Sequence, residues 1–193
     1  MMKKTLTVFD IDDTLFTTEA KIRVRKNGEV QKILSNTEFN HYKLDHLEEF
    51  DFSEFRDAKI FRYTAKPIHP IFQLAKDKIK NNTECSKTIL LTARQDFDDR
   101  EVFLQTFYDH NFPIHMAHVE RAGNLSSRYR TGGNISKLAI IKRYVDTHKF
   151  ERVEVFDDCI KNLVTISKLR HFYPKIHMDM WLVKGESLVS WQL

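Results

Sequence analysis

Three carboxylates and a hydroxyl lie close together near the start of the sequence. Asp10, Asp12, Asp13 and Thr14 follow directly on the apolar run at residues 6–9, which indicates a buried strand that carries charged groups to the end of a sheet. Like charges crowded together raise at least one pKa and cost stability unless a cation joins them. The cluster therefore predicts a metal site, acid–base chemistry or both. A carboxylate-rich turn, in which Asp is also common, is the plain alternative.

Polar groups that could complete such a site follow two later apolar runs. Thr92 comes after residues 88–91, and the pair Asp157-Asp158 comes after residues 153–156. Several carboxylates that meet at one edge of a parallel sheet form an oxygen-ligand site for a hard cation. Mg²⁺ suits such a site because it prefers few carboxylates together with substrate oxygens and water.

An alternation of strands and helices beyond residue 67 explains how these groups could meet. We expect strands at 88–91, about 114–119, 153–156 and about 178–183, and helices at about 68–79, 102–108, 135–148 and 160–172. With the first strand, this order predicts an α/β fold: a Rossmann-like parallel sheet of about five strands with helices on both faces. Sites in such sheets form at the carboxyl ends of the strands. Lys137 lies near the start of a predicted helix, a place that attracts anions.

An insertion from about 16 to 66 follows the first strand. Residues 21–34 alternate around Asn27-Gly28, which is a strong hairpin signal. Residues 35–66 are irregular and aromatic-rich, and Ser53 is a candidate cap for a short helix. We expect a β-hairpin flap and a small cap with its own minor core, within one domain that spans residues 1–193.

Composition and charge narrow the class of protein. The chain has 193 residues, 41% of them hydrophobic, and its two cysteines lie too far apart to suggest a disulfide framework or a zinc site. No apolar run approaches the roughly 18 residues of a membrane span, so we expect a cytoplasmic protein with no membrane partner. The sequence carries no signal for an oligomeric state. Residues 121–143 include six lysines and arginines and no acid, and we expect much of this basic stretch to form a glycine-containing loop.

Taken in order, these groups match four motifs of a known family. The matched residues are Asp10-Ile11-Asp12-Asp13-Thr14, Thr92, Lys137 and Asp157-Asp158. The chain thereby resembles the haloacid dehalogenase (HAD) superfamily of phosphohydrolases over nearly its whole length. The resemblance implies that Asp10 attacks phosphorus to form an aspartyl-phosphate and that Asp12 is the general acid and base. It also implies that Thr92 and Lys137 hold the phosphoryl oxygens.

The same resemblance implies a Mg²⁺ cofactor. Its ligands would be Asp10, the main-chain carbonyl of Asp12, and Asp157, with Asp158 binding directly or through water. The second aspartate of the first motif points to the phosphohydrolase branch rather than the dehalogenase branch. Asp13 departs from the family, which most often has glycine there, although Asp tolerates a left-handed turn.

Several segments are similar to the 3′-phosphatase domain of viral-type polynucleotide kinases. They are Arg94 after Thr92, the stretch at 115–125, and the segment at 181–185. In those enzymes arginines at such positions grip the phosphates of a nucleic-acid end, as the planar guanidinium allows. The candidates here are Arg94, Arg121, Arg128 and Arg130.

Three functions remain open at this point. The leading one is removal of a terminal 3′ phosphate from a polynucleotide. A nucleotidase acting on nucleoside monophosphates is the close alternative, because a closing cap favours small substrates. A nucleic-acid-binding module with a vestigial phosphatase site is the third, but binding alone requires neither Asp10 nor Asp12. Arg121 and Arg128 could also be ordinary surface charges.

Overall fold

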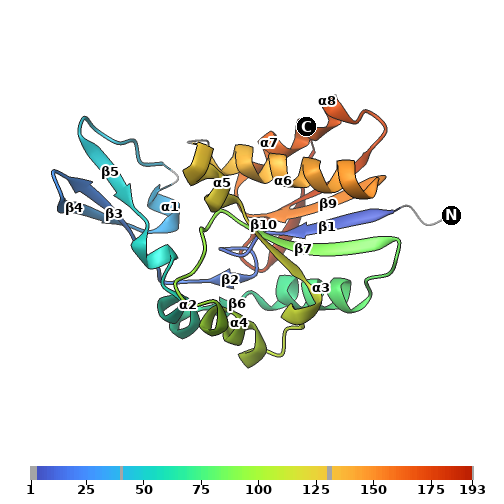
Figure 1. Ribbon diagram of the computed structural model, residues 1–193, viewed down its shortest axis with the longest axis horizontal. Helices are drawn as coiled ribbons and strands as arrows, with labels where there is room; N and C mark the ends of the chain where they lie inside the picture. Colours follow the sequence, from blue (N-terminus) through green and yellow to red (C-terminus); the bar gives the residue numbers. More distant parts are fainter. Residues whose placement is uncertain (1–3, 40, 130–131, 193) are drawn as a thin grey trace.

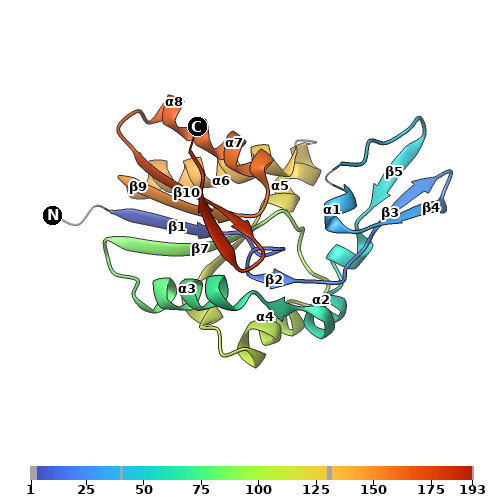
Figure 2. The same cartoon turned by 180° about the vertical axis from the view of Figure 1, so that it is seen from behind.

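A six-stranded sheet lies at the centre of the computed structural model, which describes residues 4–39, 41–129 and 132–192. The strand order is β11-β10-β9-β1-β7-β8 (Figure 1). The parallel strands are β1 (Thr5–Phe9), β7 (Ser86–Thr92), β8 (His118–Arg121), β9 (Arg152–Asp157) and β10 (His177–Lys184). The sixth strand, β11 (Ser187–Ser190), pairs antiparallel with β10 at one edge (Figure 2). The expected α/β fold with a parallel sheet is confirmed, and β11 is an addition to it.

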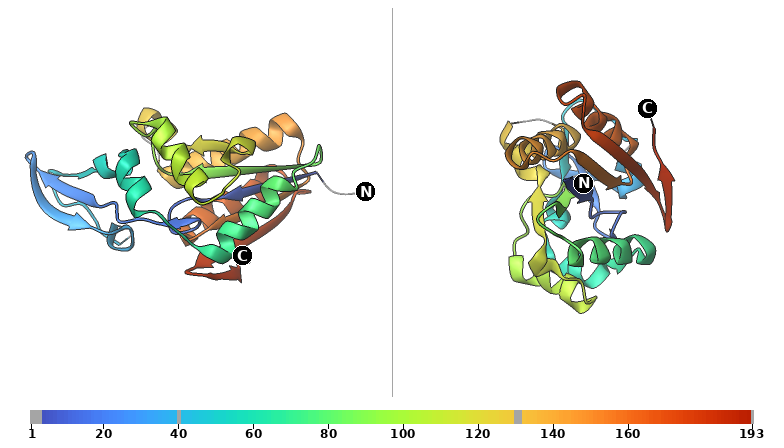
Figure 3. Two further views of the ribbon diagram at one scale, coloured as in Figure 1. Left: turned by 90° about the horizontal axis from the view of Figure 1, so that it is seen from below. Right: turned by 90° about the vertical axis from the view of Figure 1, so that its right-hand side faces the viewer.

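Helices cover both faces of this sheet (Figure 3). One face packs on α3 (His69–Lys80) and α4 (Arg100–Asp109), and the other on α6 (Gly133–His148), α7 (Ile160–Ser167) and α8 (Leu169–Phe172). Because side chains alternate along a strand, Leu6 and Val8 of β1 join the α6 and α7 side, whereas Phe9 joins the α3 and α4 side. Both faces of β1 are therefore buried, as its mostly apolar and β-branched sequence indicates. No helix in the described ranges has the length and apolar character needed to cross a membrane.

Three element predictions in this part are wrong in detail. The strand expected at 114–119 starts later, because Ile114–Met116 forms a 3₁₀ turn after Pro113 and β8 begins at His118. The helix expected at 160–172 is divided into α7 and α8. The basic stretch expected as a loop forms the helix α5 (Ala122–Tyr129).

The glycine that suggested a loop has a packing role in α5. A Cβ on Gly123 would lie 2.4 Å from the carbonyl oxygen of Ala93 and 2.5 Å from that of Arg94. The Gly123 amide also donates a hydrogen bond to the Arg94 carbonyl at 3.2 Å. Glycine therefore allows the start of α5 to contact the chain that follows β7.

The insertion forms a separate small sheet beyond the carboxyl ends of the parallel strands (Figure 1). Its strands are β3 (Ile22–Lys26), β4 (Glu29–Leu34) and β5 (Glu48–Asp51), in the order β4-β3-β5, and the short strands β2 (Phe16–Thr17) and β6 (Lys66–Pro67) pair at its base. The hairpin at Asn27-Gly28 is confirmed, with both residues at positive φ. The sequence did not predict β5.

The minor core of the insertion is also confirmed. It contains Ala20, Ile22, Val24, Leu34 and Phe55, with Phe39, Tyr42 and Phe50 packed against it. Three helical segments surround it: α1 (Asn36–Phe39), a 3₁₀ turn at Ser53–Phe55 and α2 (Ala58–Thr64). Ser53 is not a helix cap. Asp57 caps α2 instead, by accepting a hydrogen bond from the Ile60 amide at 2.8 Å.

Candidate active site

The predicted acidic groups meet at one edge of the central sheet. The strands β9, β1 and β7 are neighbours and parallel, so the residues at their carboxyl ends lie side by side. Asp10 follows β1, Asp157 ends β9 and Thr92 ends β7. The Asp10 amide continues the pairing by donating to the Phe156 carbonyl at 2.9 Å. Residues that are 147 positions apart in sequence are thus brought together by the sheet.

A buried lysine joins two of these carboxylates. The Nζ of Lys137 donates to Oδ1 of Asp10 at 2.6 Å and to Oδ2 of Asp157 at 2.7 Å. The side chains of Lys137 and Asp157 are each 2% exposed, and that of Asp10 is 7% exposed. Lys137 reaches this position from one turn inside α6, whose first residue is Gly133. Because buried charges must be paired, the lysine offsets part of the acidic charge.

Asp157 is oriented by groups that the sequence did not identify. Its Oδ1 accepts hydrogen bonds from the Cys159 amide at 2.9 Å and from the side-chain amide of Asn162, also at 2.9 Å. Cys159 is the residue before α7, and Asn162 lies in its first turn. The helix start thereby holds Oδ1, while Oδ2 accepts from Lys137 and, at 3.1 Å, also from Asn162.

Asp158 adds a third carboxylate to the group. Oxygen atoms of Asp10, Asp157 and Asp158 all lie within 4.8 Å of one another. Burial raises the pKa of Asp158 to about 7, with Asp157 adding to the effect and Lys137 opposing it. Burial also raises the pKa of Asp10 well above its usual range, against the opposing charge of Lys137. Lys137 keeps its proton, because the two carboxylates outweigh the effect of burial and raise its pKa.

The charge and donor set of this group fit a divalent cation. Three ionised carboxylates with one ammonium carry a net charge of minus two, and the neighbouring carboxylates add to the effect of burial in raising the pKa values of Asp10 and Asp158. Carboxylate oxygens are the ligands that hard cations such as Mg²⁺ and Ca²⁺ prefer. Asp12 supplies no side-chain oxygen to this group of three, so only its main-chain carbonyl could serve, as the family resemblance implies.

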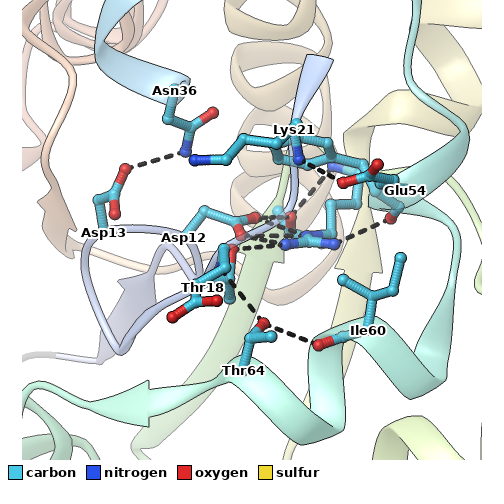
Figure 4. A network of polar contacts seen from close by, with 12 residues as sticks. Asp12, Asp13, Thr18, Lys21, Asn36, Glu54, Ile60 and Thr64 are labelled. Carbon is cyan, nitrogen blue, oxygen red and sulfur yellow. Dashed lines mark hydrogen bonds and ion pairs between the residues drawn. The ribbon is translucent and has the colours of Figure 1, made fainter. Parts of the chain in front are cut away.

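The carboxylate of Asp12 is instead held by Arg94. The Nε of Arg94 lies 3.0 Å from both carboxylate oxygens, and one terminal nitrogen lies 2.6 Å from Oδ1. The same terminal nitrogen donates to the Thr18 hydroxyl at 3.2 Å, and the other to the Phe55 carbonyl at 3.0 Å. Figure 4 shows Asp12 and Thr18 side by side in this network.

Arg94 therefore occupies a different place from the one expected of a substrate-binding arginine. Its side chain is 1% exposed and lies over the rings of Phe55, Phe61 and Phe97, at 4.5, 4.9 and 5.3 Å from their centroids. All of its guanidinium nitrogens donate within the protein. Arg94 thus positions Asp12 and connects it to the insertion.

Thr92 lies next to the same carboxylate. Its hydroxyl donates to Oδ2 of Asp12 at 3.3 Å and accepts from the Arg94 amide at 3.0 Å. The side chain is fully buried. The predicted phosphate-binding threonine thus lies beside the predicted general acid, at the end of β7.

Asp13 gains a partner that the sequence did not reveal. Its backbone is left-handed, with φ of 55°, as expected where the family most often has glycine. Its Oδ2 accepts from the side-chain amide of Asn36 in α1 at 2.9 Å (Figure 4). Burial raises the pKa of Asp13, and the Asn36 hydrogen bond opposes this. Asp13 therefore links the loop after β1 to the insertion.

The remaining arginines lie around β8 and α5. Arg121 pairs in register with Thr92 across β8 and β7, contacts Asp96 at 3.0 Å and lies over the Phe103 ring. Its side chain is 13% exposed. Arg128 lies on the exposed last turn of α5. Arg130 lies outside the described residues.

Comparisons with known proteins give no relative for this chain. A scan against protein-family models finds no match, and neither the curated proteins nor the solved structures include a match.

Proposed function

We propose that this protein is a phosphomonoester hydrolase of the HAD type, in which Asp10 is the nucleophile. The observation that carries the proposal is the position of Asp10. It is a buried carboxylate at the end of the central strand, 2.6 Å from the Lys137 ammonium and grouped with Asp157 and Asp158. A structural carboxylate does not require two further acids beside it, because like charges destabilise one another.

The reaction proceeds in two steps on this arrangement. An Asp10 oxygen attacks phosphorus, the ester P–O bond breaks, and Asp12, as the general acid, gives a proton to the leaving oxygen. Water then attacks phosphorus of the aspartyl-phosphate, Asp12 takes the proton from that water, and the acyl P–O bond breaks to release phosphate and regenerate Asp10. Arg94 and Thr92 hold the Asp12 carboxyl in place for both transfers.

Lys137 and a divalent cation offset negative charge in this scheme. Asp10, Asp157 and Asp158, with the main-chain carbonyl of Asp12, would hold Mg²⁺, which when bound lowers the repulsion between the nucleophile and the phosphate. Lys137 supplies a fixed positive charge beside Asp10. Thr92 and Lys137 would also contact the phosphoryl oxygens.

The leading substrate is a polynucleotide end that carries a 3′ phosphate. The absence of acids from residues 121–143 and the position of Arg121 beside Thr92 support it. The insertion gives weight to the alternative, a nucleoside monophosphate. Two arginines of its hairpin are already paired, Arg23 with Glu54 and Arg25 with Asp51 at 2.7 Å, so the insertion offers a polymer less positive charge than its sequence suggests.

Replacement of the nucleophile tests the mechanism. Asp10→Asn removes the attacking carboxylate, and we expect Mg²⁺-dependent phosphate release from a generic phosphoester to fall by at least about 10³-fold. The matched control is Asp77→Asn, which changes an exposed aspartate on α3 and should leave the rate unchanged. Full activity in Asp10→Asn would rule out the mechanism.

A substrate panel tests the second part of the proposal. A 3′-phosphorylated oligonucleotide and nucleoside monophosphates are compared at matched concentration over a range of salt. We expect kcat/KM to favour the oligonucleotide and the preference to decline steeply with salt, because contacts to several phosphates release counterions. A preference for monomers that salt does not change would assign the nucleotidase activity instead.

A further inference from the structure

A group of basic side chains lies at the opposite edge of the central sheet. Lys4, Lys87, His118 and His148 line a surface cavity of about 310 Å³, together with residues that include Asn82, Glu84, Thr88 and Phe150. The cavity lies where β1 and β7 begin, whereas Asp10 and Thr92 lie where these strands end. Five residues of strand separate the two edges by roughly 17 Å, so this cavity is distinct from the candidate active site.

Aromatic rings hold the basic groups in a row. Lys87 lies over the Tyr144 ring at 5.4 Å, and Lys4 lies over the Phe150 ring at 5.8 Å. The His148 ring lies between them, 5.8 Å from Tyr144 and 5.6 Å from Phe150. Cation–π contacts attract an ammonium without neutralising its charge. These ring contacts therefore leave the positive charge of both lysines available.

Few carboxylates lie near the basic side chains of this cavity. Glu84 is the single acid among the residues that line the cavity. In the described part of the chain, neither Lys4 nor Lys87 has a carboxylate within ion-pair distance. Burial lowers the pKa of His148, and the charges of Lys87, Lys4 and His118 lower it further. The cavity thus has a positive potential that a bound anion would relieve.

A neutral donor also faces this region. Asn82 lines the cavity, and its Oδ1 accepts a hydrogen bond from the Thr88 hydroxyl at 3.0 Å, so its Nδ2 group remains available as a donor. Thr88 is buried, so this hydrogen bond fixes the orientation of the amide. Two ammonium groups and an amide donor form a set that suits a tetrahedral oxyanion.

We propose that this cavity is an anion site that binds a phosphate-like or sulfate-like oxyanion between Lys4, Lys87 and Asn82. The proposal does not depend on the phosphatase assignment, because none of these residues belongs to the carboxyl edge. The ligand is a small dianion that balances the two lysines.

Titration of the histidine rings by NMR tests this site in the full-length protein. Sulfate is the probe, because it keeps its charge across the pH range, and chloride at equal ionic strength is the reference. We expect saturable binding that moves the midpoint of the His148 titration up by about one pH unit, as a nearby opposite charge does. No movement of the midpoint, or movement that does not saturate, would overturn the proposal.

Two pairs of variants locate the site. Lys4→Gln with Lys87→Gln should abolish the sulfate effect, while Lys168→Gln with Lys175→Gln, which changes two exposed lysines elsewhere, should preserve it. Asn82→Asp is a second probe that keeps both lysines and should weaken sulfate binding at least tenfold through repulsion. An undiminished sulfate effect in both Asn82→Asp and the Lys4 and Lys87 pair would place the anion elsewhere and overturn the proposal.

A final measurement distinguishes two possible ligands, a free oxyanion and the phosphodiesters of a nucleic acid. An oligonucleotide without terminal phosphates presents phosphodiesters that do not engage Asp10. If it moves the His148 midpoint and sulfate does not, the cavity contacts a polymer and the small-oxyanion proposal fails. If sulfate alone moves the midpoint, the proposal holds.

Discussion

The carboxyl edge of the central sheet, where the parallel strands end, and its amino edge, where they begin, carry excess charge of opposite sign. At the carboxyl edge, each buried cation contacts a carboxylate, Lys137 with Asp10 and Asp157, and Arg94 with Asp12, and acidic charge is still in excess. At the amino edge, Lys4 and Lys87 lie on aromatic rings, and positive charge is in excess. The sign of the excess agrees with the proposed ligands: a cation at the carboxyl edge and an anion at the amino edge.

One helix takes part in both edges. α6 carries Lys137 near its start and His148 at its end, and Figure 1 shows it running along the sheet. The positive end of the helix dipole therefore lies toward the acidic edge, and its negative end lies toward the basic edge. The dipole moderates the charge excess at each edge but leaves its sign unchanged.

The largest expected effect is a difference in stability between variants that lack one lysine at each edge. Lys137→Met leaves Asp10 and Asp157 buried without their cation, and we expect the free energy of unfolding in metal-free buffer to fall by about 3–5 kcal/mol. Lys87→Met, the matched change at the amino edge, should alter it by less than about 0.5 kcal/mol. Urea denaturation followed by circular dichroism measures both. Equal losses would contradict the comparison.

The next effect in size is the contribution of Asp158 to the pH dependence of stability in the metal-free protein. The pKa of Asp158 is about 7 in the folded protein, above the ordinary 3.8, so the folded state holds this proton more tightly. Its stabilising contribution is complete below about pH 4 and is lost as pH rises through about 7, a change on the order of 4 kcal/mol. Urea denaturation in chelator at several pH values should show this decline, and Asp158→Asn should flatten it. A stability that rises over this interval would contradict the assignment.

The smallest effect probes the amino edge alone. Lys87→Gln removes a positive neighbour of His148, and we expect the midpoint of the His148 titration to rise by on the order of a few tenths of a pH unit. Proton NMR of the ring measures this in the absence of added anions, with Lys168→Gln as the control. A lower midpoint would show that Lys87 does not act on His148 by charge repulsion.

The meeting of Asp10, Asp157 and Thr92 could be predicted from the sequence. It follows from a general property of parallel sheets, that strand ends meet at one edge, and it requires only the recognition of apolar runs. The helix that carries Lys137 was likewise evident from its spacing. The strands are recognisable in the sequence because burial on both faces requires runs of apolar residues.

Other contacts could not be predicted because they depend on side-chain direction over long sequence separations. Arg94 and Asp12 are 82 residues apart, and no pattern indicates that this arginine turns inward rather than toward substrate. β5 lacks an apolar run and is held to β3 partly by the ion pair of Arg25 with Asp51. α5 was not predicted because the stretch at 121–143 contains three glycines, which are a loop signal, whereas Gly123 serves close packing here.

That close packing at Gly123 has a mechanical consequence. With its amide bonded to the Arg94 carbonyl and no room for a Cβ, the start of α5 cannot shift without moving the residues that hold Asp12. The start of α5 and the end of β7 are therefore mechanically coupled. Position 123 consequently has a single permitted amino acid, whereas Gly185, with open space around it, is constrained by its backbone angle alone.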